Sequence, residues 1–195
     1  SNQRLAKYIT ISNGNRSNAL KLYKANLSLS ESLYSVLSHF EIAFRNAINQ
    51  QLSIHFSDND WIINQRTEYM MHRRLGSSIS KYRFVQKRKI DNTINDLSNN
   101  GATTVSSGMI IAAQTLGFWT KFYERNHYAA VGGAGALLPI FKNRPSNTTR
   151  SNIYDKLTTI RVLRNRIAHH EPICFIQGSH SFSLQNTKEV YDEIC

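Results

Sequence analysis

Apolar residues recur every three or four positions along much of the chain, the spacing that buries one face of an α-helix. The longest such stretch opens at Ser28 and Glu31, which match a capping box. A shorter helix is expected just before it, over residues 18–26. The long stretch therefore predicts a second helix whose buried positions are Leu33, Leu37, Phe40, Phe44, Ile48 and Leu52.

Three further segments are predicted to be helical: residues 105–123, residues 187–195 and the last long helix, which is described below. No segment alternates apolar and polar residues for long enough to form a sheet. Residues 105–123 are rich in apolar and small residues and predict one buried helix, interrupted by polar residues too soon for a membrane span. Residues 187–195 predict a short acidic helix. The fold class predicted from this pattern is all-α, a helical bundle.

The last long helix is predicted to start at Thr148 or Thr149 and to end before Pro172, because a residue that precedes proline is pushed out of the α region. Its apolar residues fall within about a third of the helix circumference. Arg164 projects into this stripe, where a guanidinium needs an anion from the protein or from a ligand. The stripe consists of Ile153, Leu157, Ile160, Leu163 and Ile167.

The end of this helix carries the candidate chemistry. Arg161, Asn165 and His169 follow one another at intervals of four and share a face beside the stripe, and His170 comes next. Arginine and histidine at a helix end can hold a phosphate and move a proton beside it. The alternative is structural: Arg164 pairs with a carboxylate such as Glu41, and the histidines only finish the helix.

The charge of the chain points to a polyanionic partner. Its 195 residues, enough for one domain, carry 24 Lys and Arg against 13 Asp and Glu, a formal net charge of +11. Nucleic acid is the first candidate partner and an anionic membrane surface the second; a merely basic protein is the third reading. Two cysteines are too few for a disulfide scaffold. With no signal peptide and no membrane span in the sequence, we expect a cytoplasmic protein.

Basic residues are densest in residues 66–89, where aromatic residues are interleaved with them. This mixture can neutralise phosphates and stack unpaired bases. The alternative is a solvated helix face whose aromatic side chains turn to the core. The predicted phosphate contacts are Arg73, Arg74, Arg83, Lys87 and Arg88, and the aromatic residues are Tyr69, Tyr82 and Phe84.

Three stretches resemble a known family. Arg164 and Asn165, three further residues and then His169 look like the signature of the HEPN superfamily, and residues 163–173 resemble its Abi-like (abortive infection) branch. Residues 40–48 and 116–119 fit that branch in the same order. The resemblance runs over residues 17–173 and implies a HEPN-type antiparallel helical bundle with additional helices. Residues 1–16 are then an N-terminal segment, and residues 174–195 a polar C-terminal segment with a short helix.

The resemblance implies a metal-independent endoribonuclease, toxin-like or abortive in phage defence, that acts by attack of a ribose 2′-OH. Its catalytic residues are Arg164, Asn165 and His169, without a cofactor or metal; neither adjacent histidines nor a missing His-Glu-x-x-His motif suggests a metal site. A base and an acid are both needed, so two chains are expected to pair as a homodimer around one composite site. The substrate-binding residues are expected to be Arg45, Asn46, Arg161 and His170, beside the basic residues named above.

Two alternatives stay open, and the chain departs from the family at one position. Arg45 can form a helix-surface ion pair with Glu41 instead of binding RNA. The protein can be a non-catalytic RNA-binding or protein-interaction module that keeps the fold. HEPN toxins silenced by a nucleotidyltransferase carry a tyrosine two positions after the motif histidine, where this chain has Glu171. That mode of silencing is not expected here, which leaves room for another antitoxin or regulatory partner.

Overall fold

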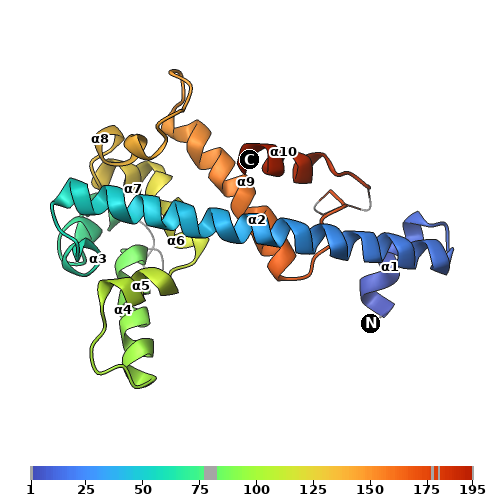
Figure 1. The fold of residues 1–195 in the computed structure, drawn as a ribbon, viewed down its shortest axis with the longest axis horizontal. Coiled ribbons are helices and arrows are strands. Elements are labelled where there is room, and N and C mark those ends of the chain that lie inside the picture. The colour runs from blue at the N-terminus through green and yellow to red at the C-terminus, as the bar shows by residue number, and fades with distance from the viewer. Residues whose placement is uncertain (1, 77–82, 177, 180, 195) are drawn as a thin grey trace. The chain divides into compact units, whose positions relative to one another are not determined.

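The computed structural model describes residues 2–76, 83–176, 178–179 and 181–194, with side chains from residue 5 onwards. Within these ranges the chain forms α-helices and short 3₁₀ turns and no β-strand (Figure 1). An isolated antiparallel bridge joins Phe175 to Phe182. The predicted all-α class is therefore confirmed, while the HEPN-type arrangement of the helices stays a prediction.

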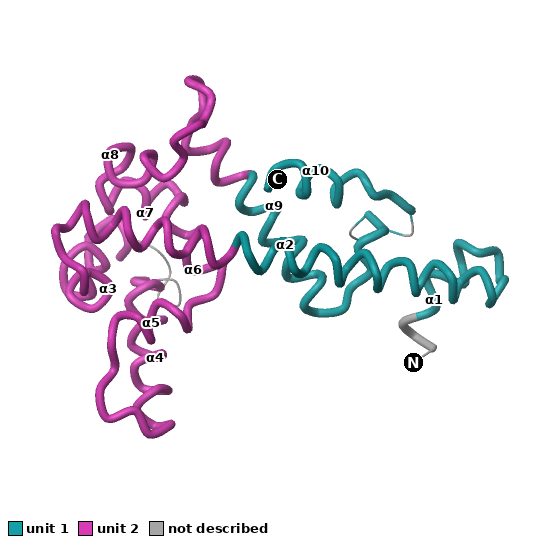
Figure 2. Tube along the Cα trace, viewed as in Figure 1, with its two compact units in different colours: residues 1–40, 156–195 teal, residues 41–155 magenta. Residues whose placement is uncertain are grey.

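The chain divides into two compact units, which are described separately (Figure 2). Unit 1 consists of residues 1–40 and 156–195, and unit 2 of residues 41–155. Two long helices contribute to both units: α2 (Arg16–Phe56) and α9 (Arg150–Ala168). The domain boundaries expected at residues 16 and 173 stay a prediction.

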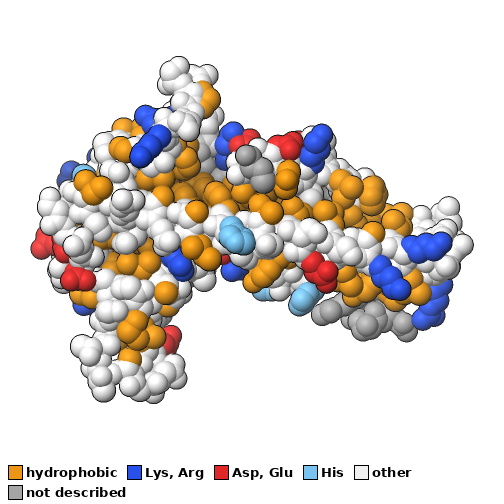
Figure 3. Space-filling model, viewed as in Figure 1, with side chains coloured by type: hydrophobic (Ala, Val, Ile, Leu, Met, Phe, Trp, Pro, Cys, Tyr) orange, Lys and Arg blue, Asp and Glu red, His pale blue; other side chains and the backbone are white. Residues whose placement is uncertain are grey.

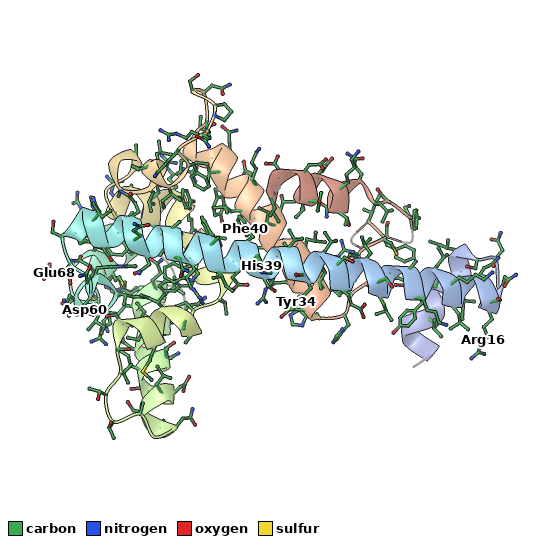
Figure 4. All side chains as sticks on the ribbon, viewed as in Figure 1. Arg16, Tyr34, His39, Phe40, Asp60 and Glu68 are labelled. Carbon is green, nitrogen blue, oxygen red and sulfur yellow. The ribbon has the colours of Figure 1, made fainter. Side chains whose placement is uncertain are left out.

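The two helices expected on either side of Ser28 are one continuous helix, α2, so the capping-box prediction was wrong. No glycine or proline interrupts residues 16–56, and the hydroxyls of the supposed cap bond inside the helix instead. Ser30 Oγ donates to Asn26 O at 2.8 Å, and Ser32 Oγ to Ser28 O at 3.0 Å. The helix starts after Asn15, whose Oδ1 accepts from Asn18 N at 3.1 Å as an N-cap does. Figure 4 labels four side chains along α2: Arg16, Tyr34, His39 and Phe40.

Unit 1 is built around the first part of α2 and the second part of α9. Its other helices are α1 (Asn2–Ile11) and α10 (Gln185–Ile194). The bounds of α10 differ by two residues or fewer from those of the helix predicted over residues 187–195. A small core joins α1 and α2 to the chain that follows α9. Tyr8 packs edge-to-face on Tyr23 and on Phe175, with ring centroids 5.6 Å and 5.2 Å apart, a geometry that aromatic pairs prefer. Unit 1 therefore depends on residues from both ends of the sequence.

Unit 2 has an aromatic core formed by Trp61, Phe118, Trp119, Phe122 and Tyr123, all almost fully buried. Short helices and turns surround it. In chain order they are α3 (Trp61–Asn64), η1 (Tyr69–Met71), η2 (Arg73–Leu75), α4 (Val85–Asn99), α5 (Ser107–Ala113), α6 (Leu116–Thr120), η4 (Lys121–Tyr123), α7 (Arg125–Ala130), α8 (Ala134–Leu137) and η5 (Leu138–Ile140).

The single helix predicted over residues 105–123 is broken into α5, α6 and η4. The break lies at Gln114 and Thr115, whose backbones are extended, with ψ of 137° and 162°. Charged side chains of α2 hold both helix ends at this break. Glu41 Oε1 accepts from Leu116 N at 2.7 Å, and Arg45 Nη1 donates to Ala112 O at 3.3 Å. A carboxylate at a helix N-terminus and a guanidinium at a C-terminus are each favourable. Periodicity could not reveal these long-range partners.

Candidate functional site

The predicted apolar stripe of α9 is confirmed, since all five of its residues are buried. The helix nevertheless ends at Ala168, before the position expected from Pro172. His170 adopts a left-handed backbone with φ of 55°. Its N–H donates to Ile167 O at 2.9 Å, and Glu171 N donates to Arg166 O at 2.8 Å. These paired bonds form a Schellman motif, which satisfies the last carbonyls of the helix.

This ending places the two motif histidines outside the last regular turn, and both are exposed. His169 N still donates to Asn165 O at 2.9 Å, so His169 continues the face that carries Arg161 and Asn165. Arg161, Arg164 and Asn165 are half-buried on α9 itself. His170 is not helical, so its side chain does not point about 100° further around the helix than that of His169, the direction expected for the next residue of a helix.

The arginine most deeply buried at this end of α9 is Arg166, which is not among the site residues predicted from the sequence. Arg164, which was expected to project into the buried stripe, is only half-buried. Arg166 Nη2 donates to Pro172 O and, at 2.9 Å, to Phe175 O. Its Nε lies 3.7 Å from a Glu171 carboxylate oxygen. Arg166 therefore fastens the chain after the motif to the helix. Arg166 stands outside the apolar stripe of α9, so the helical pattern gives no sign that it is buried. The residues that cover it come after the end of the helix in the sequence.

A buried asparagine of α2 holds the same chain from the other side. Asn26 Oδ1 accepts from Ile173 N at 2.9 Å and from Cys174 N at 3.2 Å. Thr187 Oγ1 donates to Ile173 O at 3.2 Å. The sequence does carry a signal for Asn26, although Asn26 was not among the predicted residues. Ala19, Asn26 and Leu33 are spaced by seven and all buried, so Asn26 stands on a buried face of α2.

The buried groups beneath this chain are unsuited to acid–base or nucleophilic chemistry near neutral pH. Cys174 is a buried free thiol, and its burial raises the pKa of the thiol. Burial likewise raises the pKa of the Tyr8 hydroxyl, with a further contribution from Cys174. Both groups stay protonated near neutral pH, and thiolate is the reactive form of cysteine. The accessible titratable groups at the end of α9 are the two histidines and Glu171.

The remaining predicted RNA contacts belong to unit 2, so the structure does not relate them to the motif. Arg45 holds the end of α5, as described above, and the neighbouring Asn46 is exposed. Glu41, its alternative partner, accepts from α6. The contacts of Arg45 and Asn46 with RNA stay predictions.

The basic segment of unit 2 is partly exposed and partly neutralised. Arg73 and Arg74, in η2, are exposed, and so are Arg83 and Arg88, whereas Lys87 lies 2.6 Å from Asp91 Oδ2. Arg66 Nη1 approaches the other oxygen of Asp91 at 3.0 Å. Asp91 therefore already neutralises part of the charge of Lys87, which makes this residue a less favourable phosphate contact than the sequence suggested.

Of the aromatic residues in this segment, Tyr69 cannot stack on bases. Its ring is buried against Phe56 and Phe122, and its hydroxyl donates to Gln86. Phe84 is half-buried beneath Arg83, whose guanidinium carbon lies 5.1 Å from the ring centroid. Tyr82 and Lys81 lie outside the described residues.

No group of three or more His, Cys, Asp or Glu side chains that could hold a metal occurs in the described part of the chain. None of the helices described is long and apolar enough to cross a membrane.

Fold and site together define an all-helical protein in which a capped helix presents an Arg-Asn…His motif at an exposed end. The chain belongs to the Abi-like protein family, whose sequence model matches residues 3–174. The family predicted from three stretches of sequence is thereby confirmed. Comparison with curated proteins found no match, and comparison with solved structures found none either.

Proposed function

We propose that this protein is a metal-independent endoribonuclease of HEPN type that acts in abortive infection. Membership of the Abi-like family suggests the biological setting, a defence against phage. The observation that supports catalysis is the exposed His169 at the end of α9, in line with the half-buried Arg161 and Asn165. This arrangement lets a phosphate approach an imidazole and a guanidinium from solvent.

In the proposed reaction His169, as the neutral imidazole, accepts the proton of a ribose 2′-OH. The 2′-oxygen then attacks the adjacent phosphorus, and the bond to the 5′-oxygen breaks after protonation by an acid. Arg164 stabilises the charge on the phosphorane oxygens, and Asn165 helps to orient the phosphate. Each proton transfer contributes about 10²–10⁴-fold to the rate. The products are a 2′,3′-cyclic phosphate and a 5′-hydroxyl.

One chain supplies one such histidine, whereas the reaction needs a base and an acid. A two-fold dimer that brings two α9 ends together provides both. We therefore propose a homodimer with the motif near its axis. Light scattering at micromolar concentration tests this assembly, and a monomer with full cleavage activity would contradict it.

The experiment for the activity is incubation of purified protein with mixed cellular RNA in EDTA, with wild type beside His169→Ala. Cleavage should persist in EDTA, leave cyclic phosphate ends and disappear in His169→Ala, while the melting temperature stays unchanged. A substrate with 2′-O-methyl at the scissile nucleotide should bind and stay intact. Full activity in His169→Ala would remove this residue from the mechanism; intact RNA binding without any cleavage would favour the non-catalytic RNA-binding alternative.

A further inference from the structure

A cavity of about 170 Å³ lies in unit 1 beside the motif. It is formed by α1, by the first part of α2 and by the chain that follows α9. Tyr23, Leu27 and Pro172 are among its apolar walls, and His170 and Glu171 stand at its edge on the motif side. Because His170 directly follows His169, their Cα atoms are about 3.8 Å apart. The cavity is therefore lined by the residue that directly follows the proposed proton acceptor, His169.

Asn26 supplies a fixed hydrogen-bond donor in this cavity. Its side-chain oxygen accepts from two backbone amides, Ile173 N and Cys174 N, and this settles which end of the amide is oxygen. Within the described residues, the bonds of the Asn26 side chain all go to this oxygen. Asn26 lines the cavity although the residue is only 6% exposed, and its Nδ2 is not among the enclosed unbonded atoms. Its NH₂ group therefore offers a donor that the fold holds in place.

The size and walls of the cavity fit one planar six-membered ring. An apolar cavity of about 150 Å³ accommodates benzene. A pyrimidine base has the same single ring, whereas a purine has two fused rings. Pyrimidines carry a carbonyl O2 that can accept from Asn26, and a ring or exocyclic N–H that can donate to a carboxylate such as Glu171. The apolar walls can cover the faces of the ring.

The surroundings of the cavity are basic, as an RNA strand requires. Lys7 lines the cavity, and Arg16, Lys21 and Lys24 are exposed on the first turns of α2. Figure 3 shows Lys and Arg side chains over α1 and the start of α2. Such charges can neutralise phosphates on either side of a base that has left the stack.

We propose that this cavity binds one unpaired pyrimidine base of the RNA beside the scissile phosphate, and that Asn26 selects it by donating from Nδ2 to the base carbonyl. The proposal rests on the proposed function, since it takes RNA as the substrate. Asn26 is thus a specificity-determining residue for the reaction at His169.

The test is binding of short RNA by the full chain in a His169→Ala background, which prevents cleavage during the measurement. The probes are a fluorescein-labelled oligoadenylate octamer and the same octamer with one central uridine. We expect the uridine to tighten binding about tenfold, the contribution of one well-placed hydrogen bond. Asn26→Asp keeps an oxygen for the two backbone amides and replaces the donor by an acceptor, so it should abolish the preference.

Asn49→Asp is the matched control. Asn49 also lies on α2, and its Oδ1 accepts from Trp61 Nε1 at 2.9 Å, a bond that aspartate keeps. The control adds the same charge away from the cavity and should retain the tenfold preference. If Asn26→Asp fails to fold by circular dichroism, Leu27→Trp, which fills the cavity, replaces it with the same expected loss.

The outcomes separate this proposal from the proposed function. A uridine preference that disappears only in the cavity variants supports the base site, even if wild type cleaves nothing and the nuclease proposal fails. Cleavage in EDTA with equal binding of both octamers overturns the base site and leaves the nuclease intact. Binding of neither octamer overturns the base site as well, as does a preference that survives in both cavity variants.

Discussion

Replacing Arg166 should destabilise the protein far more than replacing any other arginine of the motif. We choose Arg166→Met, because methionine keeps much of the apolar stem of arginine and removes the guanidinium. The substitution deletes the two hydrogen bonds from Nη2 to the carbonyls of Pro172 and Phe175. The bond to Phe175 O is buried, so deleting the guanidinium leaves this carbonyl oxygen without a hydrogen-bond donor and away from water.

The expected cost follows from these two bonds. A hydrogen bond to a charged group contributes about 1.5–3 kcal/mol, so the pair contributes about 3–6 kcal/mol. The ion pair with Glu171 adds little, because Glu171 is half-exposed and its carboxylate lies 3.7 Å from Nε, and exposed pairs contribute little. In a chain of this length each kcal/mol lowers the melting temperature by about 2–4 °C. We expect Arg166→Met to melt about 6–24 °C below wild type.

Differential scanning calorimetry of Arg166→Met beside Arg125→Ala measures this effect. Arg125 is exposed at the start of α7. Its loss should change the free energy of unfolding by at most about 0.5 kcal/mol, as is usual for surface substitutions. A melting temperature of Arg166→Met within about 2 °C of wild type would show that Arg166 does not hold the chain after the motif. Cleavage activity measured well below the melting transition distinguishes this structural effect from catalysis.

Three further predictions follow from individual residues. His170→Gly should raise the melting temperature by about 2–4 °C, since glycine removes the left-handed strain of roughly 1 kcal/mol, and a fall on thermal melting would contradict this. The pKa of Glu124 is lowered to about 2, first by His127, whose Nδ1 lies 3.3 Å away, and then by a lysine. Glu124→Gln should therefore unfold at a lower urea concentration than wild type at pH 7. The difference in urea midpoint between the two proteins should shrink as the pH falls from 4.5 towards 2, because the carboxylate of wild type is then protonated. A difference that does not change with pH would exclude a stabilising interaction of the Glu124 carboxylate with its basic neighbours. Replacing Arg73 and Arg74 by Ala should make the slope of log K against log salt concentration shallower by roughly 1.4, because each phosphate contact contributes about 0.7 for a single strand. Fluorescence anisotropy of labelled RNA measures this slope, and an unchanged slope would show that these two residues form a solvated face.

The helices that packing dictates could be predicted from the sequence, whereas their ends often could not. The stripe from Ile153 to Ile167 is visible as a period of about 3.6 residues, because burial of one face is a local property of a helix. The ends of helices depend on groups far away. The break at Gln114 is held by Glu41 and Arg45, which are distant in sequence.

The motif was visible in the sequence, but its immediate support was not. Arg164, Asn165 and His169 were predicted from their resemblance to the HEPN signature, and their catalytic roles stay a prediction. Arg166 is buried only because the chain turns back over it after His170, which adopts a left-handed backbone. A glycine at that position would have indicated this conformation in the sequence, whereas a histidine does not. Asn26 is the opposite case: its periodic position was readable, but its two backbone partners were 147 and 148 residues away.

That long separation has a consequence for how the protein folds during synthesis. Residues 41–155 are contiguous and can begin to fold while the rest of the chain is still being added. Unit 1 instead needs both ends of the chain. At a synthesis rate of about 5–20 residues per second, Ile173 is added roughly 7–30 s after Asn26. The end of α9 is fastened only when these two residues meet. A nascent chain therefore lacks the support of the motif until residues 173 and 174 have been added, and the proposed cleavage of RNA would start only after that point.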